Sequence, residues 1–337
     1  MGKRERKISR FIGRWITEQG AGTVEYVIVI LVAIVIGSGL LAFGNQVSEQ
    51  VTKTGDSISS WFSKANGTGG TGGGNAGGGN SGTDSRIEEL KEKDPADWTL
   101  DDQKAVAEDI EKKGNSSELY AKAKAAMDAG TEWSITLTNG IKLTYKIIGI
   151  NHDDLADGTG KAGLTFLTTT MRIKSCMNAT SVNVGGWEKS ELRAKMNSGE
   201  IWNLMPSEFQ SKVKAVKKLT NNVSATDKNA VVTATTDRLF LLSYSEIVPT
   251  SHWASDYPWT SSEGTQYEAF KGKVTNNADE NECLKGVAYW WERSVYPNAS
   301  TYFLCINSGG DPSVGDRASY TFFSSALLSA SNHPCFL

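Results

Sequence analysis

The chain has 337 residues, enough for one large domain or two smaller ones, and its 34 glycines are concentrated in one stretch. The formal net charge is −3. The first twenty residues hold six Lys and Arg against two Glu, so that removing their +4 leaves −7 for the remainder. A mildly acidic remainder lacks the clustered basic surface that nucleic-acid binding requires, and we expect no nucleic-acid partner.

An apolar run of eighteen uncharged residues extends from Tyr26 to Phe43. As a helix it would measure roughly 27 Å, close to the hydrocarbon thickness of about 30 Å. A cleaved signal peptide has a shorter core of about 7 to 15 residues and a small-residue exit site, and neither is present. The run therefore predicts a single-pass membrane helix whose basic N-terminus stays in the cytoplasm, which places residues 45–337 outside the cell.

The start of that run reads EQGAGTVEYVIVILVAIVIG, residues 18–37. It resembles the processing site of type IV prepilins, most closely the Flp pilins of Tad-type pili. The resemblance implies a basic leader, 1–20, that a prepilin peptidase removes after Gly20. Ala21 then becomes the N-terminus, and Glu25 and Tyr26 become the fifth and sixth mature residues.

A carboxylate buried among packed helices needs a cationic partner. The resemblance implies that the partner of Glu25 is the N-terminal amine of a neighbouring pilin subunit, so that Glu25 sets the register of assembly. The alternative is a plain signal anchor, with Glu25 at the headgroup level and Tyr26 as an interfacial aromatic residue. One departure is size, because Flp pilins usually end soon after the helix.

Beyond the membrane run, apolar residues recur at helical spacing up to Phe62 and extend the predicted pilin-like helix over 21–64. The linker predicted over 65–85 contains the stretch from Asn66 to Asp84, in which ten of nineteen residues are Gly. Such a chain is a flexible tether with an r.m.s. span of roughly 24 Å. We expect it to uncouple the pilin-like helix from the part that follows.

A helical lead-in is predicted over 86–130. Thr99 with Asp102 forms a capping-box pattern that begins one helix, and Gly114 ends it. Ser117 and Gly130 bound the next helix in the same way.

The last predicted region, 131–337, opens with EWSITLTNGIKLTYKIIGI, two β-rich runs around an Asn-Gly turn that predict a hairpin. GLTFLTTT and RLFLLS are interpreted as further strands. EKSELRAKMN and PSEFQSKVKAV are interpreted as short helices. Helices followed by mixed strands and short helices indicate an α+β fold rather than a doubly wound sheet.

Residues 97–337 also resemble a bacterial domain of unknown function, common in Firmicutes. The matching motifs are His152-Asp153-Asp154, Trp187 to Asn197, Leu239 to Glu246, Glu263 to Tyr267 and Trp290 to Ser294. The resemblance implies a fold related to C-type-lectin-like and formylglycine-generating-enzyme-like domains. That family usually ends in a Gly-x-Arg-Pro-like strand, whereas this sequence reads SNHPCFL and lacks the Arg, so we expect no terminal site there.

The segment 251–270 holds the candidate ligand-binding residues. It sets aromatic residues among small polar ones, a composition that suits a surface loop binding a glycan or a protein by stacking. The candidates are Trp253, Tyr257, Trp259 and Tyr267. The alternative is a structured loop that covers the core, which is also the role expected of Trp187, Trp290 and Trp291.

Metal binding has one candidate, the segment DDLADG at 153–158, whose three Asp residues are spaced as in a loop that could take Ca²⁺. It lacks the full EF-hand pattern. No metal residue or other cofactor is therefore assigned.

Four cysteines lie beyond the tether, and outside the cytoplasm an even number suggests disulfides, with three pairings open. The pairs Cys283–Cys305 and Cys176–Cys335 are favoured. Free buried thiols are the alternative, since a region of this size can bury a core without disulfides.

Enzyme motifs are sparse: the three His residues lack zinc-ligand spacing, and neither a G-x-S-x-G elbow nor a phosphate-binding loop occurs. A formylglycine-generating-enzyme-like fold raises the idea of copper-type thiol chemistry, but Cys305 and Cys335 match no motif of that kind. We expect no enzymatic activity.

Together these patterns predict a minor or tip subunit of a type IV or Tad-type pilus that presents an adhesive or recognition domain outside the cell. Its expected partners are a prepilin peptidase, other pilin subunits, the membrane, and a glycan or protein ligand. The alternatives are a membrane-anchored extracellular enzyme of formylglycine-generating-enzyme-like fold and a structural surface protein with no ligand.

Overall fold

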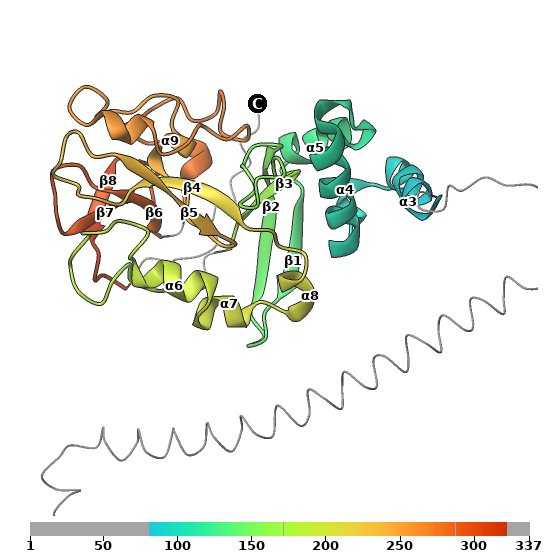
Figure 1. Ribbon diagram of the computed structural model, residues 1–337, viewed down its shortest axis with the longest axis horizontal. Coiled ribbons are helices and arrows are strands. Elements are labelled where there is room, and N and C mark those ends of the chain that lie inside the picture. Colours follow the sequence, from blue (N-terminus) through green and yellow to red (C-terminus); the bar gives the residue numbers. More distant parts are fainter. Residues whose placement is uncertain (1–80, 171, 287, 322–337) are drawn as a thin grey trace, which may run out of the picture. The chain divides into compact units, whose positions relative to one another are not determined.

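The computed structural model describes residues 81–170, 172–286 and 288–321 (Figure 1). The predicted leader, the membrane helix and most of the tether lie outside the described residues, as do Gly20, Ala21, Glu25 and Tyr26. Within the described ranges, no helix combines the length and apolar character needed to cross a bilayer.

Three helices open the described chain: α3 (Ser81–Glu92), α4 (Leu100–Lys113) and α5 (Glu118–Asp128). The predicted capping box at the start of α4 is confirmed, since the Thr99 hydroxyl accepts a hydrogen bond from the Asp102 N–H while the Asp102 carboxylate accepts one from the Thr99 N–H. Ser117 caps α5 as predicted. Helix α3 begins inside the stretch predicted as tether.

A three-stranded antiparallel sheet follows, in the order β1 (Glu132–Thr136), β2 (Lys142–Ile150) and β3 (Leu164–Thr168). The predicted hairpin joins β1 to β2, and Gly140 takes the positive φ of 84° that its tight turn needs. Helix α5 packs on β2 (Figure 1). The register of β2 on β3 shifts at Gly149, where a Cβ atom would lie 2.7 Å from the Tyr267 ring.

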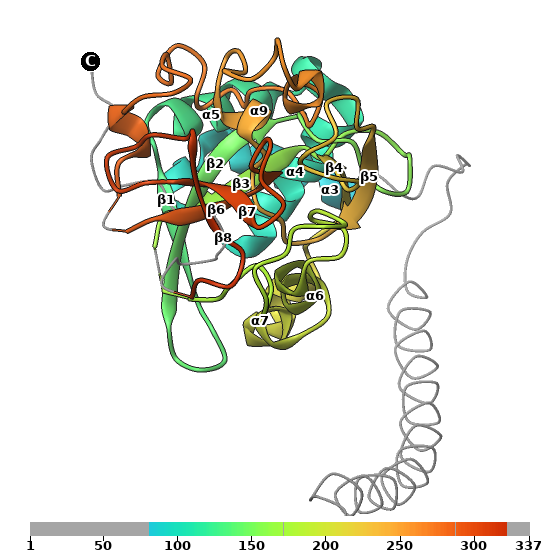
Figure 2. The same cartoon turned by 90° about the vertical axis from the view of Figure 1, so that its left-hand side faces the viewer.

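Two further antiparallel sheets complete the fold. One pairs β4 (Val216–Asn221) with β5 (Val232–Asp237), and the other runs β6 (Trp290–Val295), β7 (Tyr302–Ile306), β8 (Val314–Arg317). Strand β4 contacts β6, and Figure 2 shows β6, β7 and β8 side by side at the front of that view. The described part is therefore mixed α+β with small antiparallel sheets, as the sequence predicted.

Short helices and turns connect the sheets: α6 (Glu191–Asn197), α7 (Glu200–Leu204), α8 (Ser207–Gln210), α9 (Tyr244–Ile247), and the 3-10 turns η1 (Pro95–Asp97), η2 (Gly114–Ser116), η3 (Pro258–Ser261) and η4 (Glu282–Leu284). The helix predicted from PSEFQSKVKAV stops after one turn, at Gln210.

The strand predicted from RLFLLS, residues 238–243, is wrong: the segment is irregular although buried at Leu239, Leu241 and Leu242. Its backbone carbonyls accept hydrogen bonds from Arg293 of β6 instead of extending a sheet. The Leu242 carbonyl accepts the Arg293 N–H at 2.8 Å, and the Leu241 carbonyl accepts Arg293 Nη1 at 2.7 Å. A run of apolar residues thus marks burial here without marking a strand.

The core residues expected among the tryptophans are confirmed, since Trp187, Trp290 and Trp291 are all buried. The Trp187 Nε1 donates a hydrogen bond of 2.9 Å to Asp237 Oδ2, which gives the buried indole its polar partner. Outside helices α3, α4 and α5, most of the core is thus formed by three sheets whose strands come from distant parts of the sequence.

Candidate functional site

Charged and polar side chains from distant segments converge in the interior. We call them the buried charge cluster: Asp153, Lys218, Glu246, Glu263, Tyr267, Arg293 and Ser294. Each is at most 5% exposed. All but Lys218 belong to the sequence motifs described above, so these motifs, which lie between residues 152 and 294, meet at one place.

Arg293 is the centre of the cluster. Its Nη1 lies 2.5 Å from Glu246 Oε2 and its Nη2 2.9 Å from Glu246 Oε1, a two-pronged ion pair. The remaining guanidinium hydrogens are donated to the carbonyls of Leu219, Leu241 and Glu263 and to the Thr220 hydroxyl. Burial disfavours the charged form of Glu246, but Arg293 and then Lys218 outweigh it and lower the pKa of this carboxyl.

Lys218 enters the cluster from β4. Its Nζ lies 2.7 Å from Asp153 Oδ1, 2.6 Å from Glu246 Oε1 and 3.0 Å from the Tyr267 hydroxyl. The same ammonium sits 4.2 Å from the centroid of the Phe240 ring. Burial opposes ionisation of Asp153, yet the nearby Lys218 holds the pKa of that carboxyl at about 2.

Two carboxyls, Glu263 of the cluster and Glu292 on β6, have no cation that outweighs the cost of their burial. Burial raises the pKa of Glu263 to about 7, although the Ser294 hydroxyl and the Asn221 N–H both donate to it. Burial also raises the pKa of Glu292 well above its usual range, and Glu263 and Asp311 add to the effect. Neither Glu292 oxygen has a hydrogen-bond partner among the described residues, so nothing in this part of the chain offsets the cost of burying its charge.

The predicted aromatic loop does not form a stacking platform. Tyr257, Trp259 and Tyr267 are buried, and Trp253 is partly buried against the rings of Tyr244 and Tyr296. The alternative of a core-covering loop therefore describes the segment. Burying large aromatic rings stabilises the fold, and exposed rings would forgo that gain.

The three aspartates of the predicted Ca²⁺ loop diverge. Asp153 faces Lys218 inside the cluster, Asp154 pairs with Lys161 at 3.0 Å on the surface, and Asp157 accepts hydrogen bonds from Thr159. The described ranges hold no group of three or more His, Cys, Asp and Glu placed to bind a metal ion.

The favoured pairing of Cys283 with Cys305 is wrong: no disulfide joins them. Cys283 lies in η4 and Cys305 in β7, and both side chains are buried. The second favoured pair includes Cys335, which lies outside the described residues. Burial raises the pKa of the Cys305 thiol well above its usual range, and the Glu292 carboxyl raises it further, which favours an unreactive thiol.

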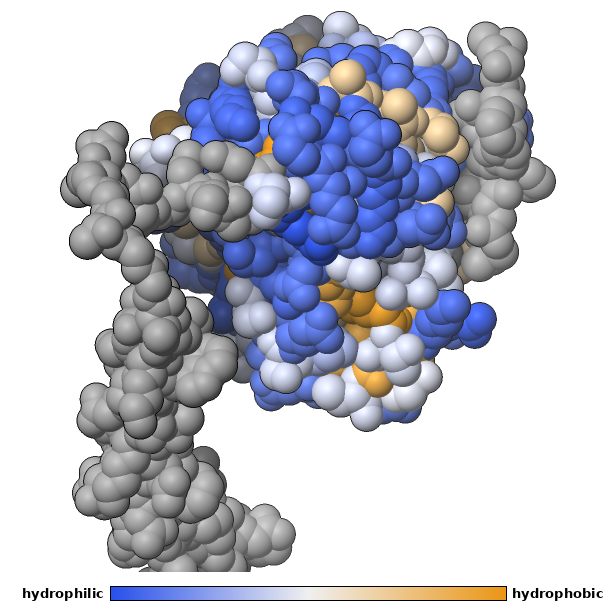
Figure 3. All heavy atoms as spheres, turned by 90° about the vertical axis from the view of Figure 1, so that its right-hand side faces the viewer, coloured by the Kyte–Doolittle hydropathy of each residue, from blue (hydrophilic) through white to orange (hydrophobic). Residues whose placement is uncertain are grey.

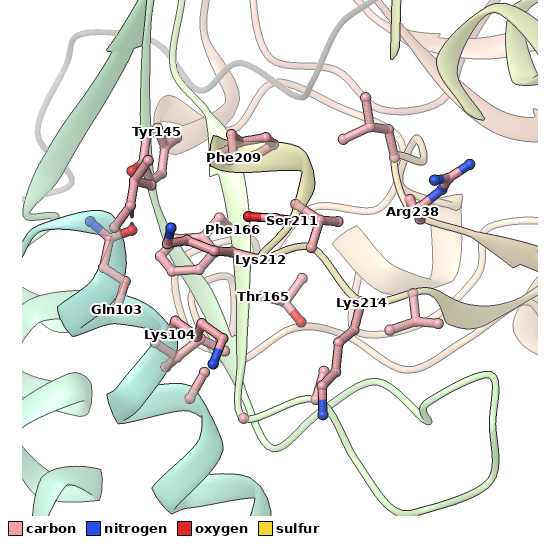
Figure 4. A pocket seen from close by; sticks show the side chains of 18 of the residues that line it. Gln103, Lys104, Tyr145, Thr165, Phe166, Phe209, Ser211, Lys212, Lys214 and Arg238 are labelled. Carbon is pink, nitrogen blue, oxygen red and sulfur yellow. Dashed lines mark hydrogen bonds between the residues drawn. The ribbon is translucent and has the colours of Figure 1, made fainter. Parts of the chain in front are cut away.

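A pocket of about 250 Å³ opens beside the cluster, between α4, the first sheet and the segments 209–216 and 238–240. Its walls are mainly apolar: Leu100, Ala107, Ile135, Leu164, Phe166, Phe209, Val213, Leu239 and Phe240 line it. The Tyr145 hydroxyl at one side donates to Gln103 Oε1 at 3.0 Å, so this pair is already satisfied (Figure 4). An apolar pocket with few free polar groups is typical of ligand sites.

Charged side chains flank this pocket. Lys104, Lys212, Lys214 and Arg238 are set against Glu108 and Glu111, a formal surplus of +2 among the lining residues. Lys104 and Lys214 come from opposite sides (Figure 4) and pair with Glu108 and Glu111, respectively. On the face seen in Figure 3 the surface is largely hydrophilic, interrupted by an apolar patch.

Pocket and cluster share a wall. Thr165 of β3 lines the pocket and donates a hydrogen bond of 2.6 Å to Asp153 Oδ2. Phe240 lines the pocket, and the Lys218 ammonium lies 4.2 Å from the centroid of its ring. The position of the pocket wall is thus fixed by buried ionic contacts behind it.

Sequence reasoning missed Lys218 and the pocket. The alternation of VKKLTN over β4 carried a signal for Lys218, because it shares a face with Val216 and Thr220, and all three are buried. The pocket had no comparable signal, since its walls come from six separate segments.

Residues 162–321, just under half of the chain, match the family model of a domain of unknown function (DUF6273). The match includes Lys218, Glu246, Glu263, Tyr267 and Arg293, whereas Asp153 and helix α4 lie outside it. Neither the curated proteins nor the solved structures contain a match to this chain.

Proposed function

We propose that this chain is a pilin-like subunit, at a minor or tip position of a type IV or Tad-type pilus, that presents residues 81–337 outside the cell for recognition. The observation that carries the proposal is the register of Gly20, Ala21, Glu25 and Tyr26 ahead of an uncharged run. Prepilin peptidase, neighbouring pilins and the membrane are its proposed partners. Its bulk suits a minor or tip position, because a fibre cannot easily carry such a part on every subunit.

The mature N-terminus tests the proposal. Mass spectrometry of protein extracted from cells should find a chain that begins at Ala21, with an N-methylated amine. Glu25→Ala should be processed but assemble poorly into filaments. Glu18→Ala is the matched control, because that carboxylate leaves with the leader. A chain beginning at Met1 or Gly2, in cells with an active prepilin peptidase, would contradict the proposal and favour a plain anchor.

We further propose that recognition takes place at the pocket beside α4, and that the ligand is a protein segment placing an apolar side chain there. Mostly apolar walls suit such a side chain better than a sugar, whose hydroxyls need several free hydrogen-bonding groups. Lys104, Lys212 and Lys214 on the rim already pair with carboxylates, whereas Arg238 donates to the Asn197 carbonyl and favours an acidic residue next to the inserted side chain.

Peptide binding separates this idea from the alternatives. A library of short peptides should enrich sequences that combine Phe or Leu with Asp or Glu. Val213→Trp, which fills the pocket, should abolish binding of the enriched peptides by the full chain. Val223→Trp, at a valine that is 49% exposed and does not line the pocket, should preserve it. Equal binding by both variants would place recognition elsewhere, and absence of any bound peptide would favour a structural surface protein.

The finer fold proposal is a C-type-lectin-like arrangement, supported by the small antiparallel sheets and the long irregular segments between them. An experimental structure that superposes on C-type-lectin-like domains would establish it. The enzyme alternative receives no support from Cys305, whose buried thiol has a raised pKa.

A further inference from the structure

A lysine, an aspartate and a glutamate meet in the protein interior with almost no contact with solvent. Lys218, Asp153 and Glu246 are 2%, 5% and 2% exposed. Lys218 Nζ lies within 2.7 Å of an oxygen of each carboxyl. The centroids of the Phe240 and Tyr267 rings lie 4.2 and 5.3 Å from Nζ. A nucleophile, an electrophile and a proton carrier are therefore held together in a site that excludes water.

We propose that Lys218 and Asp153 condense to form an intramolecular amide bond that joins β4 to the loop after β2. The new bond links Lys218 Nζ to Asp153 Cγ, and one Cγ–Oδ bond breaks. Glu246 relays two protons to the departing oxygen, one from the ammonium before attack and one from the same nitrogen after the new bond has formed. The ammonium and carboxylate become an amide and one water, so the reaction needs no oxidant, reductant or activating co-reactant.

The surroundings of Asp153 favour attack at its carboxyl carbon. Thr165 Oγ1 donates to Asp153 Oδ2 at 2.6 Å, and the Tyr267 hydroxyl lies 2.8 Å from both carboxyl oxygens. Preorganised donors of this kind stabilise the negative charge that develops on oxygen when a nucleophile adds. The two hydroxyls would hold that oxygen while Lys218 bonds to the carbon.

The charge balance also favours the product. Before reaction, the ammonium of Lys218 and the guanidinium of Arg293 face the carboxylates of Asp153 and Glu246. Condensation removes one charge of each sign and leaves the Arg293–Glu246 pair complete. Two buried ions, which are costly to keep out of water, are replaced by one neutral amide.

Intact-mass spectrometry of the full chain tests this proposal and does not depend on the pilus assignment. The folded wild-type protein should be lighter than the mass calculated for its observed N-terminus by about 18 Da, one water. Trypsin should then release residues 147–161 joined to residues 218–228, because an acylated Lys218 is not cleaved. Asp153→Asn should show a loss of about 17 Da instead, since ammonia leaves.

The controls separate the amide from other dehydrations. Lys218→Arg should restore the full mass, whereas Lys217→Arg, at the exposed neighbour on β4, should keep the deficit. A cyclic imide at Asp157-Gly158 also loses one water, but its tryptic peptide would not be joined to 218–228. A wild-type protein that keeps its full calculated mass after days at neutral pH, or a deficit that maps outside Asp153 and Lys218, would overturn the proposal.

Discussion

The buried charge cluster and the pocket are neighbours that distribute polar and apolar groups in opposite ways. The cluster keeps ions in the dry interior, where Arg293 alone binds one carboxylate, three carbonyls and a hydroxyl. The pocket exposes apolar side chains to solvent and keeps its charges on the rim. Buried charges tolerate little change because each partner depends on another, whereas an open apolar surface tolerates substitution and is available to a ligand.

The largest expected effect is that of Arg293→Met. This change leaves Glu246 buried beside Lys218 with half of its compensation and removes a donor from the carbonyls of Leu219, Leu241 and Glu263, of which Glu263 keeps the Ser243 hydroxyl. We expect the free energy of unfolding to fall by about 3–5 kcal/mol, measured by urea denaturation of the full chain. Arg317→Met, at an exposed position on β8, should change it by less than about 0.5 kcal/mol. A loss as small at Arg293 as at Arg317 would contradict the central role given to the cluster.

Glu263→Gln tests the pH dependence of the cluster. Because burial raises the pKa of Glu263 to about 7 from 4.5, the fold favours its protonated form. Its contribution to stability is therefore complete below pH 4.5 and is lost as the pH rises towards 7. The stability of Glu263→Gln relative to wild type should rise by about 2–3 kcal/mol across that window. Denaturation at several pH values, with the exposed Glu188→Gln as control, would reveal a constant difference if Glu263 were ionised throughout.

A smaller effect, of opposite sign, is expected at Glu292. Replacing it by Met removes two buried oxygens that lack partners among the described residues, and should stabilise the fold by about 1 kcal/mol at pH 7. Glu292→Gln keeps a polar group in place and should change stability little. A marked loss of stability in both variants, measured by thermal unfolding, would mean that the carboxyl is bound in solution.

The pocket should give the smallest effect on stability. Val213→Trp fills open space rather than packed core, so the free energy of unfolding should stay within about 0.5 kcal/mol of wild type. Chemical denaturation alongside Val223→Trp measures this. A large loss of stability for Val213→Trp alone would show that the pocket is a packed part of the core, as the cluster is.

Local chemistry made much of the fold predictable. Thr99, Ser117 and the Asn139-Gly140 turn act within a few residues, and each one determined a helix start or a hairpin as predicted. The buried tryptophans followed from size alone. The predictions that were wrong concern segments whose partners are distant in sequence. Residues 238–243 form no strand and bind Arg293 through their carbonyls, and the aromatic loop packs onto the core. The charge cluster combines both cases, since its motif residues were visible but their meeting with Lys218 was not.

The order in which the cluster's members appear along the chain has a consequence for biosynthesis. Glu246 and Lys218 leave the ribosome before Arg293, which follows Glu246 by 47 residues. Until β6 is made, Glu246 lacks its ion pair with Arg293, so the sheets made earlier cannot bury it with its full set of partners. Maturation of the whole region therefore waits for its last third. A nascent chain arrested before Trp290 should remain sensitive to proteases, and one released beyond β8 should not.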